Sequence, residues 1–195
     1  MYTDENLQDH EFDFWSNYWN SDWVEKVKDR NNNFVLPFFE SFKDASYPIL
    51  EIGSGGFPIS QMVDIEVAVC DPLHDKLKDL DIFHYLKDMR SYSCPFFEMG
   101  EQDKFNTIIC LNCLDHFNNN EYFFEKASNL LNVGGKIYLF YHLRNEDRDD
   151  HLAIDQKSVE LEISKRFTIY KESKESDPNV GGWTDGAVRY ILIKN

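Results

Sequence analysis

The chain has 195 residues, of which 42% are hydrophobic and 15% aromatic, and it carries a formal net charge of −15 at pH 7. A chain of this length and composition can bury one sizeable core, so we expect a single domain over residues 1–195. The negative charge excludes polyanionic partners, so we expect no nucleic acid and no membrane surface; the oligomeric state stays open. The acidic N-terminus lacks the positive charge and apolar stretch of a signal peptide, which favours a cytoplasmic protein.

Aromatic residues recur at helical spacing near the N-terminus, which predicts a helical segment over residues 1–45 in front of an α/β core at 46–195. Asn20-Ser21-Asp22 interrupts the pattern, and Asp22 is expected to cap a second helix. Residues 34–42 predict one more helix. The first segment has two interpretations: an amphipathic helix packed on a sheet, or a lid in which Trp15 closes over a ligand. The spaced residues are Phe12, Trp15, Trp19, Trp23 and Val27.

A glycine turn follows the first predicted strand, Ile49–Ile52. Gly53 and Gly55 allow a tight turn and a close approach of the backbone to a ligand, and Pro58 suits the first position of a following helix. The next apolar run ends at Asp71, where a carboxylate can accept hydrogen bonds from both hydroxyls of a ribose. This order of strand, turn, helix, strand and acid predicts a ligand that contains a ribose.

Pro58 also helps to decide which ribose-containing cofactor the turn would bind. A dinucleotide fingerprint G-x-G-x-x-G that starts at Gly53 requires glycine at position 58, so NAD is disfavoured. The turn instead resembles motif I, E-x-G-x-G-x-G, of the class I S-adenosylmethionine-dependent methyltransferases. Glu51, Gly53 and Gly55 match this motif, and Phe57 stands where the family has its third glycine.

Three later segments extend the resemblance over roughly residues 47–142. Residues 100–101 resemble the segment beside adenine, residues 105–116 the fourth-strand motif FDlVxxxnaLDH, and residues 130–139 the LLkpGGxxyl entry to the fifth strand. The resemblance implies one methyltransferase domain with a Rossmann-like, doubly wound α/β sheet of seven strands, an antiparallel last strand and N-terminal lid helices. The apolar runs that end the chain, Phe167–Tyr170 and Val188–Ile193, are expected to form its closing hairpin.

The same resemblance implies S-adenosyl-L-methionine as the cofactor. The glycine turn would hold its methionine part, Asp71 its ribose, and the residues after Asp71 its adenine, while Trp15 would cover it. The implied cofactor-binding residues are Trp15, Glu51, Gly53, Ser54, Gly55, Asp71, Pro72, Leu73, Gly100, Glu101, Gln102, Asn112, Cys113 and Leu114.

Methyl transfer from a sulfonium mainly requires alignment, so a base matters only when the acceptor is a hydroxyl or a protonated amine. Asp115 and His116 follow the fourth strand and His142 the fifth, at the edge where open α/β sheets bind ligands. We expect His142 to be the base, with Glu146 one helical turn on to orient its ring. The alternatives are His116 as the base, and histidines that only cap a neighbouring helix; Asp115 is the remaining catalytic candidate.

No metal site is expected. The acidic stretch from Glu146 to His151 is typical of a solvated charged loop, because hard cations need converging oxygen ligands. The C-x-x-C pair Cys110 and Cys113 is interpreted as buried thiols, since a structural zinc site needs four ligands. Four cysteines without that pattern fit a reducing compartment.

Three segments resemble a group of small bacterial methyltransferases linked to sugar and surface-glycan biosynthesis. They are an E-x-FW-like stretch at Glu11–Trp15, an avDPLa-like strand end at Val69–Leu73, and H-x-x-N-E at His142–Glu146. The resemblance implies O-methylation of a small polar acceptor, a sugar or nucleotide-sugar. Two alternatives remain open: N-methylation of a small molecule, and a non-catalytic protein that binds an S-adenosyl ligand.

Overall fold

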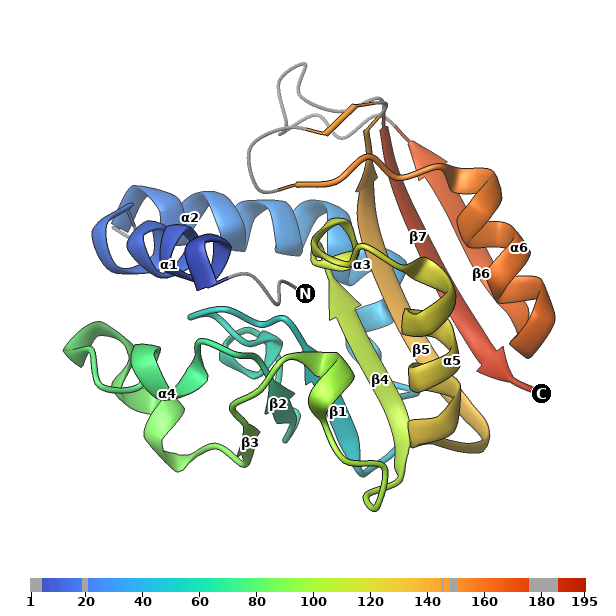
Figure 1. Ribbon diagram of the computed structural model, residues 1–195, viewed down its shortest axis with the longest axis horizontal. Helices are drawn as coiled ribbons and strands as arrows, with labels where there is room; N and C mark the ends of the chain where they lie inside the picture. The colour runs from blue at the N-terminus through green and yellow to red at the C-terminus, as the bar shows by residue number, and fades with distance from the viewer. Residues whose placement is uncertain (1–4, 19–20, 145, 148–150, 176–185) are drawn as a thin grey trace.

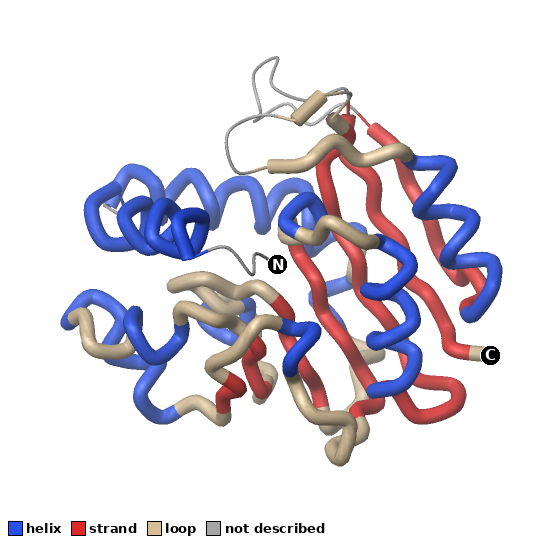
Figure 2. The backbone as a smooth tube through the Cα atoms, in the orientation of Figure 1, coloured by secondary structure: helices blue, strands red, loops and turns tan. Residues whose placement is uncertain are grey.

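The computed structural model describes residues 5–18, 21–144, 146–147, 151–175 and 186–195. They form a seven-stranded sheet with helices on both faces (Figures 1 and 2). The strand order is β3-β2-β1-β4-β5-β7-β6. The strands are β1 (Ile49–Ile52), β2 (Ala68–Cys70), β3 (Ser91–Tyr92), β4 (Phe105–Leu111), β5 (Leu131–Leu143), β6 (Phe167–Glu175) and β7 (Gly186–Lys194).

The pairing of the strands matches the expected doubly wound topology. β3, β2, β1, β4 and β5 pair in parallel, whereas β7 runs antiparallel to β5 and β6 antiparallel to β7. The predicted seven-stranded α/β sheet with an antiparallel last strand is therefore confirmed. β6 and β7 form the predicted closing hairpin, and the loop between them lies outside the described residues.

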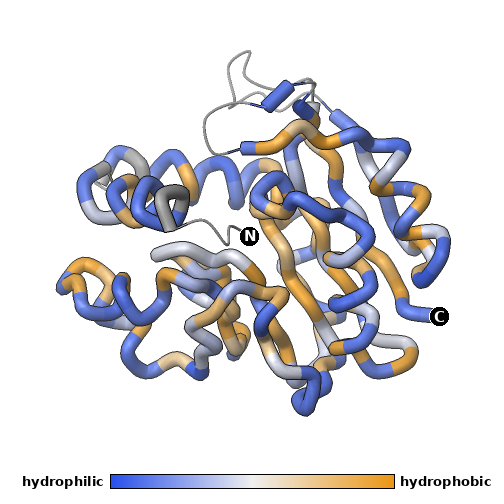
Figure 3. The backbone as a smooth tube through the Cα atoms, in the orientation of Figure 1, coloured by the Kyte–Doolittle hydropathy of each residue, from blue (hydrophilic) through white to orange (hydrophobic). Residues whose placement is uncertain are grey.

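Side chains of the central strands alternate between two cores, one on each face of the sheet. In β4, Ile108 and Cys110 belong to the core under α5 and α6, whereas Ile109 belongs to the core under the segment 31–42. This alternation explains why the strands are continuous hydrophobic runs, because both faces are covered (Figure 3). The covering elements are α5 (Asn120–Leu130) and α6 (Gln156–Arg166), and, opposite them, η2 (Asn31–Val35), α3 (Leu36–Phe38) and η3 (Glu40–Phe42).

The crossover from β1 to β2 differs from the prediction. Pro58 has an extended backbone, with ψ of 151°, and the helical turn after it, η4 (Ile59–Gln61), has only three residues. Pro58 thus precedes the turn and does not occupy its first position. The Glu51 carboxylate accepts the first free N–H of η4, that of Ile59, so the turn is capped from β1. The other short helices are α4 (His74–Leu77), η5 (Asp81–Asp88), η6 (Phe96–Glu98) and η7 (Leu114–His116).

The N-terminal segment is helical, as predicted. It comprises α1 (Glu5–Asp13), η1 (Phe14–Tyr18) and α2 (Ser21–Arg30). Of the interruption expected at residues 20–22, Ser21 and Asp22 lie in α2, and residue 20 lies outside the described residues. Asp22 lies inside the first turn of α2, so its prediction as the cap is wrong. Figure 1 shows α1 and α2 on the side of the sheet to which the arrow of β4 points. Among the described residues, none of the helices combines the length and apolar character that a membrane span requires.

Candidate functional site

The glycine turn lies at the carboxyl end of β1. Gly53 and Gly55 have φ values of 66° and 53°, in the left-handed region that glycine enters without steric cost. The Gly53 N–H donates to the Cys70 carbonyl at the end of β2 over 3.0 Å. The turn is therefore fixed directly beside the residue that follows β2.

That residue, Asp71, is 5% exposed. Its Oδ2 accepts a hydrogen bond from the Gly55 N–H at 2.8 Å, and its Oδ1 accepts one from the Leu73 N–H at 2.8 Å. Burial raises the pKa of the Asp71 carboxyl, and the two backbone hydrogen bonds oppose this effect. A carboxylate offers about four lone-pair positions, so each oxygen keeps one for a ligand hydroxyl. Asp71 thus has the acceptor capacity that a ribose needs.

Glu51 is buried on the other side of the turn, 3% exposed. Both of its oxygens face the Ile59 N–H, at 3.1 and 2.9 Å. Burial raises the pKa of Glu51 to about 8; the Ile59 hydrogen bond lowers it and the charge of Asp71 raises it further. At neutral pH the folded protein therefore holds Glu51 in its neutral form. Ser54, next in the turn, is also buried.

Trp15 of η1 packs directly on the turn. A Cβ atom added at Gly55 would lie 2.1 Å from Trp15 Cζ2, and one added at Gly56 would lie 2.5 Å from Phe83 Cε1. The half-buried indole meets the Phe83 ring edge-on, with 6.2 Å between ring centroids. Packing as well as φ therefore requires glycine at position 55. This placement suits both interpretations of the segment, a packed helix and a lid.

The predicted adenine residues separate into two groups. Leu73 is buried and Pro72 half-buried beside Asp71. Gly100, Glu101 and Gln102 are exposed in the connection that returns to the start of β4, and Glu101 contacts Lys126 of α5. The structure does not bring these three residues to the glycine turn.

Sequence reasoning missed the segment that does follow β3. Cys70 Sγ donates to the Cys94 carbonyl at 3.6 Å, and the Asp71 N–H donates to the Tyr92 carbonyl at 3.2 Å. Ser93 and Cys94 therefore lie at the carboxyl edge beside Asp71. The signal for them was positional: they directly follow the short strand that pairs with β2.

The residues after β4 are tied to the end of β1. Asn112 adopts φ of 56°, and its N–H donates to the Phe140 carbonyl at 2.7 Å. Cys113 Sγ donates to the Ile52 carbonyl at 3.1 Å and lies 3.1 Å from Cys110 Sγ. Both thiols are free and buried, and Leu114 is fully buried behind them. Asn112 and Cys113 thus lie next to the glycine turn.

His142 lies inside β5, which ends at Leu143, and is 3% exposed. Its Nδ1 is 2.5 Å from Asn112 Oδ1. An amide oxygen only accepts, so Nδ1 carries the proton and Nε2 is the basic nitrogen. Residues 144 and 146–147 are not helical and Glu146 is exposed, so the expected orientation of His142 by Glu146 one helical turn on is wrong. Asn112, directly after β4, orients the ring instead.

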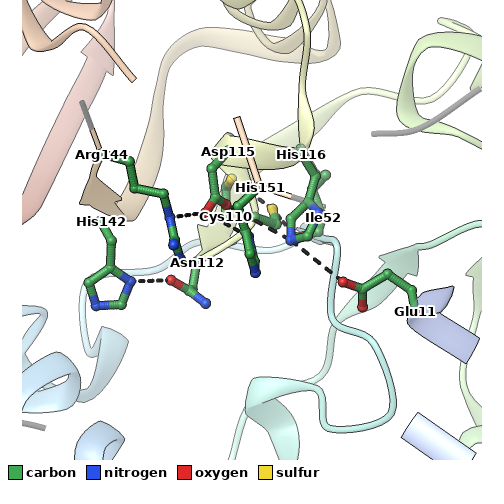
Figure 4. Close-up of polar contacts among 10 residues, drawn as sticks. Glu11, Ile52, Cys110, Asn112, Asp115, His116, His142, Arg144 and His151 are labelled. Carbon is green, nitrogen blue, oxygen red and sulfur yellow. Dashed lines mark hydrogen bonds and ion pairs between the residues drawn. The ribbon is translucent and has the colours of Figure 1, made fainter. Parts of the chain in front are cut away.

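A second polar cluster surrounds Asp115, which is 1% exposed (Figure 4). Arg144 Nε donates to Asp115 Oδ2 at 3.2 Å, and His151 Nδ1 lies 2.9 Å from the same oxygen. His116 Nε2 lies 3.9 Å from Oδ1. Burial opposes ionisation of Asp115, but the contact with His151 and the positive charges around it hold the pKa below its usual value.

Three members of this cluster were not predicted for the site: Glu11, Arg144 and His151. Glu11 Oε1 of α1 lies 4.0 Å from His116 Nε2, and the His116 and His151 rings are 4.7 Å apart. These residues come from separate segments of the chain, and no spacing rule relates them. The sequence predicts a solvated charged loop around His151, and its acidic neighbours give no sign of the contact with Asp115.

A cavity of about 510 Å³ lies beside this cluster, at the end of β5 and the start of α6. Three cationic side chains, those of Arg144, Lys157 and Lys174, line it together with Asp155 and Glu160. Its volume is in the range that binds small molecules. Three cations against two carboxylates give the lining a formal charge of about +1, and Arg144 is already paired with Asp115.

No family model and no curated protein sequence matches the chain, but solved structures do. The N-methyltransferase NodS from Bradyrhizobium japonicum WM9, in complex with S-adenosyl-L-homocysteine, matches with a TM-score of 0.65 at 12% identity, over 97% of this chain and 97% of that one. Magnesium protoporphyrin IX methyltransferase (ChlM) from Synechocystis PCC 6803 with bound S-adenosylmethionine matches with a TM-score of 0.65 at 13% identity, over 94% and 91%.

An S-adenosylmethionine-dependent methyltransferase from Clostridium acetobutylicum ATCC 824 matches with a TM-score of 0.63 at 13% identity, over 97% of this chain and 98% of that one. At these identities the likeness establishes the fold. The chain therefore has the Rossmann-like fold of these methyltransferases over nearly its whole length, which agrees with the strand order.

Proposed function

We propose that this protein binds S-adenosyl-L-methionine and transfers its methyl group to oxygen on a small polar acceptor, a sugar or nucleotide-sugar. The observation that carries the cofactor is the Asp71 carboxylate, held at the carboxyl edge by the Gly55 and Leu73 N–H groups. It keeps one lone pair on each oxygen for the two ribose hydroxyls. The fold is shared with structures that hold S-adenosyl ligands.

Different residues around the turn would bind different parts of the cofactor. Gly53 and Gly55 allow its methionine part to approach the backbone, and the amide of Asn112 lies on the same side. Glu51 is neutral and buried when no ligand is bound, and the ammonium group of the cofactor would favour its ionised form. Leu73 forms an apolar wall for the adenine.

The chemistry needs little from the protein beyond alignment and one proton transfer. The bound cofactor supplies a methyl group that is already activated on a positively charged sulfur. Alignment of acceptor and methyl group can contribute roughly 7–11 kcal/mol. When the acceptor is a hydroxyl, His142 Nε2 takes its proton, because Asn112 holds the other ring nitrogen in the protonated form. A positioned histidine of this kind contributes about 10²–10⁴-fold.

We assign the charged part of the acceptor to the cavity lined by Arg144, Lys157 and Lys174. His142 is not among its lining residues, so the reacting hydroxyl would lie outside this cavity. Its cations would pair with the phosphates of a nucleotide-sugar, although the chain as a whole is strongly acidic. N-methylation is the second candidate, because one structure of the same fold is an N-methyltransferase. An amine acceptor that arrives unprotonated would not need His142.

Calorimetry with S-adenosyl-L-homocysteine tests the cofactor. Asp71→Ala should weaken binding at least tenfold, since each hydrogen bond to a charged group contributes about 1.5–3 kcal/mol. Asp75→Ala, at an exposed carboxylate just downstream, should leave the affinity unchanged, and NAD should give no heat. Because Asp71→Ala strands two buried N–H groups, Asp71→Asn serves as a second variant that retains one acceptor oxygen.

Methyl-labelled S-adenosylmethionine, incubated with sugars, nucleotide-sugars and small amines, tests the transfer. Label on a sugar hydroxyl supports the proposal, and label on an amine replaces it with N-methylation. Tight binding without label on any of these pools supports the non-catalytic alternative. If wild-type protein does not bind S-adenosyl-L-homocysteine, the cofactor assignment itself is wrong.

A further inference from the structure

Three side chains at the carboxyl edge of the sheet converge in a way that the proposed methyl transfer does not use. The ligand atoms of Asp115, His116 and His151 all lie within 4.8 Å of one another. Figure 4 shows both imidazole rings directed toward the Asp115 carboxylate, with Arg144 on its other side. Two imidazoles and one carboxylate are the ligand set of many catalytic zinc and non-haem iron sites.

One oxygen of the Asp115 carboxylate is available for a further ligand. Asp115 Oδ1 is buried and, among the described residues, has no hydrogen-bond partner, whereas Oδ2 contacts both Arg144 and His151. A buried acceptor without a partner costs about 1–3 kcal/mol. The unused oxygen points to the side where His116 Nε2 lies, 3.9 Å away. A cation between these two atoms would satisfy both.

The separations are somewhat longer than a bound metal requires. Metal–ligand bonds of about 2.0–2.2 Å place neighbouring ligand atoms of a tetrahedral site roughly 3.3 Å apart. The largest separation here, within 4.8 Å, closes to that value by side-chain rotation of two half-buried imidazoles. His116 lies on η7 and His151 on the segment before α6, and the Leu152 N–H donates to the Asp115 carbonyl, so the backbone holds these two segments together.

The local charge also favours a cation. Asp115 and Glu11 carry two negative charges near the site, and Arg144 carries one positive charge. Glu11 Oε1 of α1 lies 4.0 Å from His116 Nε2 and places its negative charge beside the site. Arg144 on Oδ2 leaves Oδ1 available, so it acts as an outer-shell donor that orients the carboxylate.

We propose that Asp115, His116 and His151 bind one divalent first-row transition-metal ion, which leaves the fourth tetrahedral position open. This replaces the expectation that the chain has no metal site. The ion would polarise a hydroxyl of the acceptor held in the adjoining cavity, and that role alone rests on the proposed function. The site itself stands on the geometry of the cluster.

Calorimetry of the full chain with Zn²⁺, after treatment with a chelator, measures the site directly. We expect one tight site per chain, and Co²⁺ should give a visible absorption band at the same stoichiometry. His116→Ala and His151→Ala should each weaken Zn²⁺ binding at least tenfold. His84→Ala removes an exposed histidine on η5 and should change nothing, and Cys94→Ser removes the more accessible thiol and should also leave binding intact.

His116→Gln and His151→Gln preserve side-chain volume, and a thermal melt of each variant shows whether it folds. Absence of a saturable site in the wild type overturns the proposal, and so does a site that persists in both folded glutamine variants or disappears with Cys94→Ser. Binding of S-adenosyl-L-homocysteine is measured in the same samples. Its survival when the metal site fails, or its failure when the metal site survives, separates this proposal from the proposed function.

Discussion

The glycine turn and the Asp115 cluster lie at the same edge of the sheet, but they are built from different kinds of contact. In the turn, backbone N–H groups satisfy the buried carboxylates: Gly55 and Leu73 bind Asp71, and Ile59 binds Glu51. In the cluster, side chains from distant segments surround one carboxylate, Asp115. The turn therefore depends on the course of the main chain, and the cluster depends on individual side chains.

This difference predicts how each region responds to substitution. Glu51→Gln and Asp71→Asn keep an acceptor for the backbone donors, so these variants in the turn should alter pH dependence and ligand affinity more than the fold. Removal of the central side chain of the cluster leaves charged groups without a partner in a buried place. The following predictions test this contrast, beginning with the largest expected effect.

Asp115→Ala should destabilise the protein by about 3–5 kcal/mol, because it leaves the Arg144 guanidinium without its buried carboxylate. Urea denaturation in the presence of a chelator measures the change. Asp103→Ala is the matched control, since its ion pair with Arg90 is exposed, and the denaturation midpoint should not move. Equal effects of the two substitutions would contradict the structural importance of the cluster.

Glu51→Gln should flatten the pH dependence of stability. The pKa of Glu51 rises from 4.5 in the unfolded chain to about 8 in the folded protein, chiefly through burial. Its stabilising contribution is therefore complete below pH 4.5 and is lost as the pH rises through 8. Each pH unit between these values lowers the free energy of unfolding by about 1.4 kcal/mol. From pH 5 to 8 the wild type should therefore lose on the order of 3 kcal/mol of stability relative to Glu51→Gln.

Denaturation curves at several pH values, with the exposed Glu66→Gln as a control, test this expectation. A constant difference between wild type and Glu51→Gln over that range would show that Glu51 ionises normally. The turn would then contain a second buried charge beside that of Asp71, and it would resemble the Asp115 cluster more closely than the structure indicates.

The two regions also differ in how well the sequence predicts them. Gly53, Gly55 and Asp71 belong to one strand-turn-strand unit, so their order along the chain predicts where they lie. The resemblance of the same motifs to those of a known family predicts the sheet topology. The exception within the unit is η4, which Glu51 caps at its first N–H, that of Ile59, but which has only three residues. Local spacing predicts backbone geometry well, and side-chain capping less well.

The Asp115 cluster could not be predicted in this way. Glu11, His116 and His151 meet only because α1, η7 and the segment before α6 pack at one edge, and each pair is separated by at least one whole strand or helix. The same limit explains His142, which contacts Asn112 directly after the neighbouring strand β4, 30 residues away in the sequence. Gly100, Glu101 and Gln102 resembled a motif but lie on the return to β4.

His142→Ala should lower turnover by about 10²-fold, equivalent to about 2.7 kcal/mol, with little change in S-adenosyl-L-homocysteine affinity. The reason is that the base acts mainly in the transition state. Asn112→Ala should lower turnover less and shift its pH profile, because the ring would lose its fixed tautomer. Turnover is measured with the acceptor that takes up label, and His84→Ala is the control.

If His116→Ala shows this pattern and His142→Ala does not, the base belongs to the Asp115 cluster and the contrast between the two regions is sharper. If neither histidine matters, alignment alone carries the reaction.

Trp15→Ala should have the smallest effect, a loss of S-adenosyl-L-homocysteine affinity of a few-fold, about 1 kcal/mol. The indole covers Gly55 and is only half-buried, so it excludes water from the turn without forming part of the central core. Tryptophan fluorescence should change when the ligand binds, and Trp15→Phe should remove that change while the fold persists. A core role predicts the opposite: a stability loss of about 3–5 kcal/mol and identical fluorescence with and without ligand. Thermal melts of Trp15→Ala, with and without S-adenosyl-L-homocysteine, therefore decide whether η1 is a cover for the turn or part of the structure that holds it.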